Sequence, residues 1–470
     1  MTIGTEKQPL RVAIIGAGPA GFYVADHLLK QKELAVEVDM FDRLPTPFGL
    51  VRHGVAPDHQ KIKMVSRVFE KVAGKHGFRF FGNVECGTHI TNADLKQHYH
   101  QIVYTTGAQT DRKLNIPGED LQRSHPATDF VAWYNGHPDY RHLEFDLSHE
   151  KIAVIGVGNV AVDVCRLLCH SADNLAQTDI ADYALEAFRK SNVKEVYMLG
   201  RRGPAQAAFS VQEIKELGKL PDAEVRTLSE EVELDELSKA DLEANPDRTI
   251  QQKLEVLQGY ANTGPVQKSR TLTMRFLVSP VELIDDGQGG VGGMKIVRNE
   301  LYRTDDGGLR PRATDHYETL DVGMVFRSIG YHGVPLKGVP FDAKRGVIPN
   351  EQGRVIDPET SAGILGEYAA GWIKRGPTGL IGTNKPDAEE TVKRMLADLE
   401  AGDVLDPASP DPATIDQVIR ERQADLFSYE DWKQLDAHET SRGEALGRPR
   451  VKLTSLEEML DALRSAGAEK

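Results

Sequence analysis

Two glycine-rich motifs of the same form are the strongest chemical signal in this sequence. GAGPAG at residues 16–21 follows the apolar run 12–15, and GVGNVA at residues 156–161 follows the apolar run 152–155. In such a motif the first glycine makes a tight turn, the second admits a pyrophosphate, and the third small residue lets a helix pack on a strand. The N–H groups and dipole of that helix favour the negative charge. The sequence therefore predicts two dinucleotide sites.

The residue types that follow the next strand of each unit distinguish the two nucleotides. Asp42 ends the apolar strand predicted at 36–41, about 20 residues after the first motif, where an acid binds ribose hydroxyls. Arg201 and Arg202 end the strand predicted at 195–199, and a guanidinium pair there suits a 2′-phosphate. A solvated arginine pair is the alternative interpretation. We expect FAD at the first motif and NADP(H) at the second, an arrangement typical of flavin- and nicotinamide-dependent oxidoreductases.

The composition limits the classes of protein to which this chain can belong. The chain has 470 residues, 40% of them hydrophobic, and a formal net charge of −14. This acidity argues against nucleic-acid binding, and no apolar run is long enough for membrane insertion. No leader peptide fits ahead of the strand that starts near Arg11. Three cysteines give neither a disulfide framework nor a metal-ligand spacing. We therefore expect a cytoplasmic protein without a metal site. The oligomeric state stays open, with a monomer as the working expectation.

The order of predicted elements indicates an α/β fold with two Rossmann-like, three-layer dinucleotide-binding domains. Residues 1–107 form the first part of the FAD-binding domain, 108–330 the NADP-binding domain inserted into it, and 331–470 the second part, with a helical C-terminal region. A Pro- and Gly-rich loop at 43–60 should cover a ligand. Within the inserted domain, residues 228–264 are helix-prone, and strands are expected at 275–278, 293–300 and 315–320.

Several longer segments are similar to one family, the adrenodoxin reductase-type ferredoxin–NADP reductases in their bacterial form. They are GAGPAGFY at 16–23, PFGLVR at 47–52, GVAPDH at 54–59, GNVE at 82–85, GNVA with Asp163, GRRGP at 200–204, SIGY at 328–331 and GWIKRGPTG at 371–379. The resemblance spans nearly the whole chain. It implies a flavoprotein that oxidises NADPH and delivers single electrons to an iron–sulfur ferredoxin.

The motifs and the resemblance together give the site residues. FAD contacts are expected at Gly16, Gly18, Pro19, Ala20, Gly21, Asp42, Leu50, Cys86, Gly107, Trp372, Gly379, Leu380 and Ile381. NADP contacts are expected at Val157, Gly158, Asn159, Val160, Arg201, Arg202, Glu213 and Gly379. The chain departs from the family pattern at three places: His53 replaces Phe, Asp42 replaces Glu, and Leu380 replaces Val.

Hydride transfer depends on geometry more than on acid–base groups, because the flavin carries the chemistry. His59 and Asp163 are the candidates for tuning proton movement, although a hydrogen-bonded loop histidine and a helix-dipole acid explain them equally well. A helix beginning at 378–380 would stabilise negative charge on the flavin, or serve only as a helix cap. Cys165 and Cys169 lack the CxxC spacing of a redox pair and should pack in the core.

The expected partner is an acidic ferredoxin, which needs basic residues on this acidic chain. The predicted docking residues lie in or near the helix-prone stretch 228–264 of the NADP domain: Lys215, Lys219, Arg226, Lys253, Lys268 and Arg270. Alternatives are an NADPH-dependent flavoprotein reductase of related fold with another acceptor, such as a disulfide reductase or a glutamate synthase subunit, and a nucleotide sensor without turnover. The missing CxxC argues against a disulfide reductase, and the missing N-terminal cysteine cluster argues against a glutamate synthase subunit.

Overall fold

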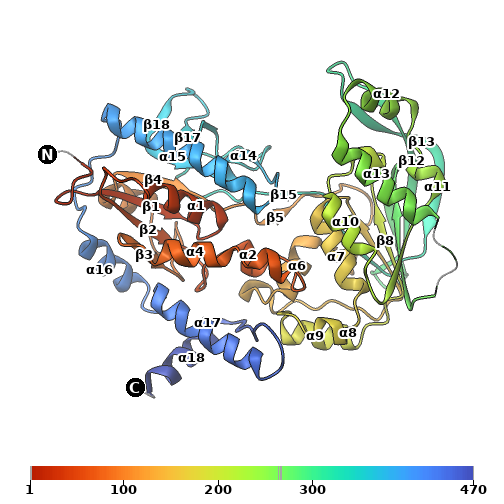
Figure 1. Cartoon of the computed structure of the whole chain (residues 1–470), viewed down its shortest axis with the longest axis horizontal. Coiled ribbons are helices and arrows are strands. Elements are labelled where there is room, and N and C mark those ends of the chain that lie inside the picture. Colours follow the sequence, from red (N-terminus) through yellow and green to blue (C-terminus); the bar gives the residue numbers. More distant parts are fainter. Residues whose placement is uncertain (1–2, 263, 265–266, 469–470) are drawn as a thin grey trace. The chain divides into compact units, whose positions relative to one another are not determined.

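The chain forms two compact units in the computed structural model, which describes residues 3–262, 264 and 267–468. The first unit contains residues up to 55, then 59–110 and 331–470. The second contains residues 56–58 and 111–330. In Figure 1 the first unit carries the red, orange and blue parts of the chain, and the second the yellow and green parts. The second unit is thus an insertion in the first.

The first unit is built on a seven-stranded sheet in the order β16-β17-β18-β4-β1-β2-β3. The five strands from β18 to β3 are parallel, and β17 and β16 are antiparallel additions. Their bounds are β1 Leu10–Ile15, β2 Val36–Phe41, β3 Phe78–Phe81, β4 Gln101–Tyr104, β16 Asn350–Glu351, β17 Arg354–Ile356 and β18 Gly363–Ala369. Strands β1 and β4 are buried throughout, as parallel strands covered on both faces must be.

Helices cover this sheet and complete a three-layer unit. One apolar core joins the sheet to α1 (Pro19–Leu28), α4 (Ser66–Ala73), α15 (Asn384–Ala401) and α17 (Tyr429–Glu444). A second core, on the other face, includes α5 (Asn92–His98) and α16 (Pro412–Arg422). Short helices α2 (Leu50–His53), α3 (Gln60–Lys63) and α14 (Trp372–Arg375) lie in the connections, and α18 (Leu456–Ala468) ends the described chain. Figure 1 shows α1 and α15 side by side.

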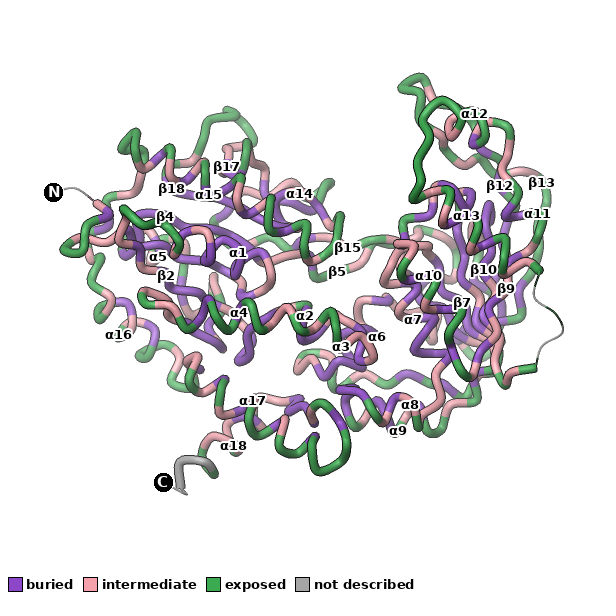
Figure 2. The backbone as a smooth tube through the Cα atoms, viewed as in Figure 1, coloured by how far each residue is buried: buried purple, intermediate pink, exposed green. Residues whose placement is uncertain are grey.

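The second unit contains a six-stranded, wholly parallel sheet in the order β6-β14-β7-β8-β10-β9. These strands are β6 Ser124–Pro126, β7 Lys151–Ile155, β8 Glu195–Leu199, β9 Ala223–Thr227, β10 Arg270–Arg275 and β14 Met324–Arg327. One face packs on helices that include α6 (Ala127–Tyr134), α7 (Asn159–Cys169), α9 (Asp182–Arg189), α10 (Val211–Leu217) and α13 (Arg248–Ala261). The central strands β7 and β14 are almost wholly buried, whereas the edge strand β6 is half-buried, and Figure 2 shows β7 mainly in the colour of buried residues.

An antiparallel sheet covers the other face of the second unit. It consists of β11 (Val278–Asp285), β12 (Val291–Arg303) and β13 (Leu309–Leu320), and it shares a core with β7, β8 and β14. Helices α11 (Ser229–Val232) and α12 (Glu236–Ala244) precede α13 in the helix-prone stretch. The predicted strand at 275–278 is wrong. Leu277 has φ +55, a left-handed conformation that ends β10 at Arg275 and starts β11 at Val278.

The observed architecture is α/β, with two Rossmann-like three-layer units, as the alternation of strands and helices in the sequence predicts. Strands 36–41 and 195–199 have the predicted bounds, and the meander at 293–320 is present as β12 and β13. Among the residues described, no helix combines the length and the apolarity that a membrane crossing requires.

Candidate dinucleotide-binding sites

The two glycine motifs make the same turn at the carboxyl end of a central strand. In the first unit the N–H of Gly16 donates to the carbonyl of Phe41, at the end of the neighbouring strand, over 2.8 Å. In the second unit the N–H of Gly156 donates to the carbonyl of Leu199 over the same distance. Both turns therefore lie beside the end of the next strand, which is where ligands bind in open α/β sheets.

No other amino acid fits at the first glycine of either motif. Gly16 has φ +109 and Gly156 has φ +136, conformations that L residues rarely adopt. A Cβ on Gly16 would lie 2.7 Å from the carbonyl oxygen of Thr105, and one on Gly156 would lie 2.1 Å from that of Ser328. The turn is therefore wedged against the next parallel strand in both units, and any side chain would displace it.

The second and third positions of the motifs fit a bound pyrophosphate. Gly18 and Gly158 are the N-caps of α1 and α7, and no atom lies within 4 Å of the position that a Cβ would take on either. A Cβ on Gly21 would lie 2.3 Å from the Gly16 carbonyl oxygen, and Ala161 is fully buried. Each helix thus packs tightly on its strand and leaves an open space in front of its N-terminus, where N–H groups lack intrahelical acceptors.

A loop closes over the second residue of each motif. The N–H of Phe48 donates to the carbonyl of Ala17 over 2.8 Å. In the second unit the N–H groups of Ala208 and Phe209 donate to the carbonyl of Val157 over 2.9 and 3.0 Å. The loop predicted at 43–60 is therefore ordered against the first glycine turn, and the second unit has an equivalent that the sequence did not indicate.

Asp42 is tied to the first turn by its carboxylate. One oxygen accepts from the N–H of Ala17 over 2.7 Å, and the other from the N–H of Leu44 over 2.9 Å. Burial raises the pKa of the Asp42 carboxyl, and these two N–H groups and the nearby Arg43 work in the opposite direction. Each carboxylate oxygen can accept more than one hydrogen bond, so a ribose hydroxyl can still be bound.

Arg201 and Arg202 give the second unit the opposite charge at the equivalent position. Arg201 is exposed, Arg202 is half-buried, and neither forms an ion pair with a described carboxylate. Burial, Arg201 and a third guanidinium, Arg310 of β13, together lower the pKa of Arg202. The side-chain amide of Asn299 holds the turn by donating to the Arg201 carbonyl over 2.8 Å. Sequence reasoning missed Arg310 because only the meander brings it near the pair.

A buried ion-pair cluster surrounds Arg166 in the second unit. Its guanidinium contacts Asp58 at 2.6 and 3.0 Å, Asp163 at 2.9 Å and Glu213 at 3.4 Å. Burial opposes the charged guanidinium, but Asp163, Asp58 and Glu213 outweigh it and raise the pKa of Arg166. Asp163 and Glu213, predicted separately, therefore converge on a residue that the sequence analysis overlooked. An arginine within the apolar run of α7 was the available signal.

The C-terminal region fastens the α2 segment in the first unit. Glu439 of α17 is fully buried and accepts two hydrogen bonds from the Arg52 guanidinium, at 2.8 and 2.5 Å, and one from Arg450 at 3.1 Å. Burial raises the pKa of the Glu439 carboxyl, but the two arginines outweigh it and lower the pKa. Phe48 packs edge-on against Trp432, with ring centres 5.7 Å apart. Residues nearly 400 positions apart thus hold the loop that closes the first turn.

The other predicted FAD residues lie on several connections of the first unit. Leu50 is the first residue of α2 and is exposed. Gly107 follows β4 with φ +71. Trp372 begins α14 and donates from its indole nitrogen to the Thr378 carbonyl over 3.2 Å. Their roles stay predictions.

The helix start expected at 378–380 agrees with the structure to within a residue, because Leu380 is the N-cap of the helical segment. A 3₁₀ turn at Ile381–Thr383 runs directly into α15 at Asn384. Gly379 just before it has φ +80, a conformation that a right-handed helix cannot include. The proposed effect of this helix end on the flavin stays a prediction.

The surroundings of the three cysteines disfavour reactive thiols. Cys165 and Cys169 are fully buried in the core of the second unit, and burial raises the pKa of both thiols, as the core-packing interpretation expects. Cys86 is half-buried, and burial and the nearby Glu367 raise its pKa to about 11. None of the three has the lowered pKa of a reactive thiol.

Two histidines of the 43–60 loop occupy different environments. His53 is buried, with its Nε2 3.3 Å from the Thr46 hydroxyl. His59 is half-buried and directly precedes α3. The proposed proton-tuning role of His59 stays a prediction.

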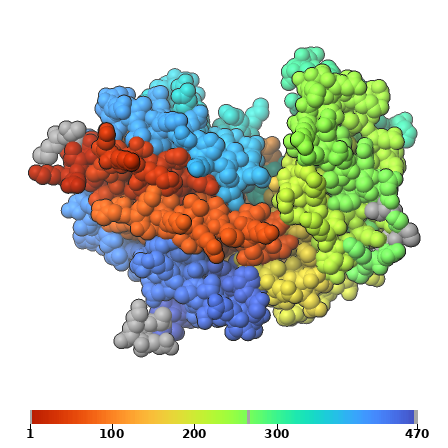
Figure 3. Space-filling model, viewed as in Figure 1, coloured from red at the N-terminus to blue at the C-terminus, as the bar shows by residue number. Residues whose placement is uncertain are grey.

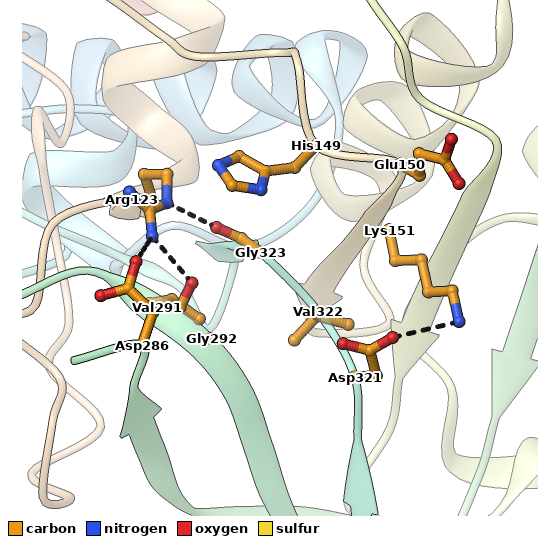
Figure 4. Close-up of a pocket in the computed structure, with 10 residues that line it drawn as sticks. All are labelled: Arg123, His149, Glu150, Lys151, Asp286, Val291, Gly292, Asp321, Val322 and Gly323. Carbon is orange, nitrogen blue, oxygen red and sulfur yellow. Dashed lines mark hydrogen bonds and ion pairs between the residues drawn. The ribbon is translucent and has the colours of Figure 1, made fainter. Parts of the chain in front are cut away.

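A cavity of about 250 Å³ lies at the other end of the parallel sheet of the second unit. Figure 4 shows Lys151, the first residue of β7, paired with Asp321 at 3.3 Å. Arg123 pairs with Asp286 at 2.5 Å and also donates to the carbonyl of Gly323, just before β14. Because it lies at the amino ends of β7 and β14 and its basic groups are paired, this cavity is not a dinucleotide site.

Most of the predicted docking residues serve the fold instead. Four donate to backbone carbonyls of their own unit: Lys253 to Ala207, Lys268 to Leu220, Arg270 to Val193 and Arg226 to Gly264. Lys253 is also buried. The docking interpretation is therefore wrong for Lys253 and weakened for the other three, and only Lys215 and Lys219 are exposed without such a bond.

Two doubly wound units, one inserted in the other and each with a glycine turn at a strand end, define the class of two-dinucleotide oxidoreductases. The model of the pyridine nucleotide-disulphide oxidoreductase family matches residues 10–202. NADPH-ferredoxin reductase FprA of Mycobacterium tuberculosis is 45% identical over 461 residues, covering 96% of this chain and 99% of the relative. A solved structure of that FprA in complex with NADPH has a TM-score of 0.89 at 43% identity, covering 97% of this chain and all of that one.

A plant protein is also similar to this chain over nearly its whole length. The mitochondrial NADPH:adrenodoxin oxidoreductase of Arabidopsis thaliana is 39% identical, covering 97% of this chain and 96% of the relative. The chain therefore belongs to the adrenodoxin reductase-type family of NADPH-ferredoxin reductases. A longer M. tuberculosis relative, named probable ferredoxin/ferredoxin–NADP reductase, is 43% identical and matches 99% of this chain over 78% of its own length.

Proposed function

We propose that this chain is a FAD-dependent NADPH:ferredoxin oxidoreductase. The first unit holds FAD and the second holds NADP(H). Bound FAD supplies the chemistry that accepts two electrons from NADPH and releases them singly. One observation carries the assignment: the same glycine turn occurs twice, with Asp42 beside the first and Arg201 and Arg202 beside the second.

The residues of the first unit suit a permanently held dinucleotide. Gly18 leaves space for a pyrophosphate, and Asp42, held at the first glycine turn, is proposed to bind a ribose hydroxyl. The buried pair Arg52–Glu439 and the contact of Phe48 with Trp432 keep the covering loop in place. The remaining predicted contacts, from Leu50 and Cys86 to Ile381, are proposed on the family resemblance.

The residues of the second unit suit an exchanging, phosphorylated nucleotide. Val157, Gly158, Asn159 and Val160 surround the N-terminus of α7. Arg201 and Arg202 are proposed to bind the 2′-phosphate, and Arg310 adds positive charge beside them. Arg166 holds Glu213 and Asp163 in place through ion pairs. These two acids can therefore contact the nucleotide only with carboxylate lone pairs that Arg166 does not use.

The acceptor is proposed to be a ferredoxin with an acidic face. The names of the relatives support a ferredoxin or adrenodoxin partner, and one relative is named as a ferredoxin and a ferredoxin–NADP reductase together. The acidity of the partner, a monomeric state and a cytoplasmic location stay predictions.

The proposed function is tested by NADPH-dependent reduction of cytochrome c in the presence of a purified bacterial ferredoxin. We expect rapid reduction that depends on NADPH and on ferredoxin, with little reduction when either is omitted. Rapid NADPH oxidation with a small-molecule oxidant, but none through ferredoxin, would favour the flavoprotein reductase with another acceptor.

A further inference from the structure

Exposed apolar side chains gather on one segment of the first unit. Ile62, Met64 and Val68 are 41%, 51% and 46% exposed, and they lie within seven residues of each other in α3 and at the start of α4. Buried neighbours such as Phe69 and Val72 already anchor α4 to the core. The exposed side chains are therefore not needed to fix this helix, and exposed apolar groups that cluster mark an interaction site.

The same segment is basic, on a chain whose net charge is −14. Lys61, Arg67 and Lys71 are exposed, and none forms an ion pair with a described acid. Glu70 is the one acidic residue between positions 61 and 71. The segment therefore presents a local positive potential that opposes the charge of the whole chain.

Helical spacing arranges these residues in two rows. Met64 and Val68 are four residues apart, and Arg67 and Lys71 are also four residues apart. Residues at this spacing are neighbours on a helix surface, so an apolar row and a basic row lie next to each other. The turns from Gln60 to Ala73 are nearly continuous, because the N–H groups of Met64 and Arg67 bond three or four residues back. The α4 segment, orange in Figure 3, lies on the face seen there.

We propose that this surface, formed by Lys61, Ile62, Met64, Arg67, Val68 and Lys71 and termed the α3–α4 patch, docks the acidic face of the iron–sulfur acceptor. The inference rests on the proposed function. An apolar centre beside unpaired cations matches a protein partner whose carboxylates surround a small apolar contact.

The position of the patch in the chain suits electron delivery. The loop that closes the first glycine turn ends at Gly54, and α3 begins at Gln60. Six residues span at most about 20 Å, so the patch stays close to the nucleotide turn of the first unit. A partner docked there is held near the proposed FAD site.

The test is charge reversal in the holoenzyme with Arg67→Glu and Lys71→Glu combined. We expect the KM for purified bacterial ferredoxin to rise about tenfold and its dependence on salt to weaken, because rim charges act mainly on association. The NADPH-dependent reduction of ferricyanide, which needs no docked protein, should stay unchanged. Met64→Gln with Val68→Gln should also raise the KM, without changing the salt dependence.

The matched control reverses the rival surface, Lys215→Glu with Lys219→Glu, the two docking residues predicted from the sequence that are exposed on the second unit. The α3–α4 proposal expects this control to keep the wild-type KM for ferredoxin. The proposal is overturned if this control raises the ferredoxin KM and the α3–α4 variants leave it unchanged. It is also overturned if the α3–α4 variants lose only binding to anionic phospholipid vesicles, which would identify a membrane surface. Failure of the wild-type enzyme to reduce ferredoxin would instead count against the proposed function.

Discussion

The two glycine turns of this chain have the same backbone and different surroundings. In both, the first glycine bonds to the end of the neighbouring strand at 2.8 Å, and a loop N–H bonds to the carbonyl of the second residue. The first turn has a tethered carboxylate, Asp42, and a loop clamped by Glu439. The second has Arg201 exposed and Arg202 half-buried. We propose that the turn provides dinucleotide binding in general and that the charge beside it selects the nucleotide.

Removing the arginine pair should have the largest effect on activity. Charge-assisted bonds contribute about 1.5–3 kcal/mol each. Arg201→Gln with Arg202→Gln should therefore lower kcat/KM for NADPH by about 10³-fold, since 1.4 kcal/mol is a factor of ten. Steady-state kinetics with both cofactors should show kcat/KM for NADH almost unchanged. The control is Arg312→Gln, which removes a guanidinium paired with Glu300. A similar loss with NADH would contradict the assignment.

Breaking the buried ion pair Arg52–Glu439 should affect the first glycine turn and leave the second one unchanged. Glu439→Ala leaves the buried Arg52 without its carboxylate partner, whereas Arg450 keeps Asp436, and an unpaired buried charge costs about 3–5 kcal/mol. Thermal unfolding of the first unit should move down by about 10 °C, because 1 kcal/mol corresponds to about 2–4 °C at this size. FAD should be released more readily.

The control for the clamp is Glu430→Gln on the same helix, whose partner Lys433 is exposed. An exposed pair contributes little, so this variant should melt like the wild type. Equal melting of the Glu439→Ala variant and the wild type would show that the C-terminal region does not hold the loop.

Asp42→Asn should weaken FAD retention by a smaller amount. The amide keeps one acceptor oxygen, so one of the N–H groups of Ala17 and Leu44 loses its partner. We expect about tenfold weaker FAD binding in equilibrium dialysis, corresponding to about 1.4 kcal/mol. Asp42→Glu should restore most of the affinity. If both variants bind FAD as tightly as the wild type, Asp42 is not part of the FAD site.

A pH dependence of stability, absent near neutral pH, is expected in the second unit. Burial, with Arg327 and Arg123 nearby, lowers the pKa of His125 from 6.5 to about 4. The unfolded chain therefore binds a proton between pH 6.5 and 4 that the folded unit does not, and stability falls as pH falls through this window. Thermal unfolding of His125→Phe, which can pack with Phe145 and Phe326, should lose this dependence. The exposed His316→Gln should keep it.

The sequence predicts local features well because they depend on neighbouring residues. The glycine turns, the strand ends at Asp42 and Arg201, and the buried pair Cys165–Cys169 all follow from spacing within one supersecondary unit. The fold class follows as well, since alternating strands and helices favour parallel sheets.

The missed features depend on residues that are distant in the sequence. Glu439 meets Arg52 across 387 positions, and Arg310 approaches Arg202 only through the meander. Lys253 was predicted as a docking residue, but the position of α13 buries it against the Ala207 carbonyl.

The most direct test of the nucleotide assignment is an anaerobic titration of the purified holoenzyme, following the flavin absorbance. NADPH should bleach the flavin near stoichiometric amounts, NADH should require a concentration higher by about 10²-fold or more, and oxidised ferredoxin should restore the absorbance. Equal bleaching by NADH and NADPH would contradict the claim that Arg201 and Arg202 select the nucleotide of the second unit.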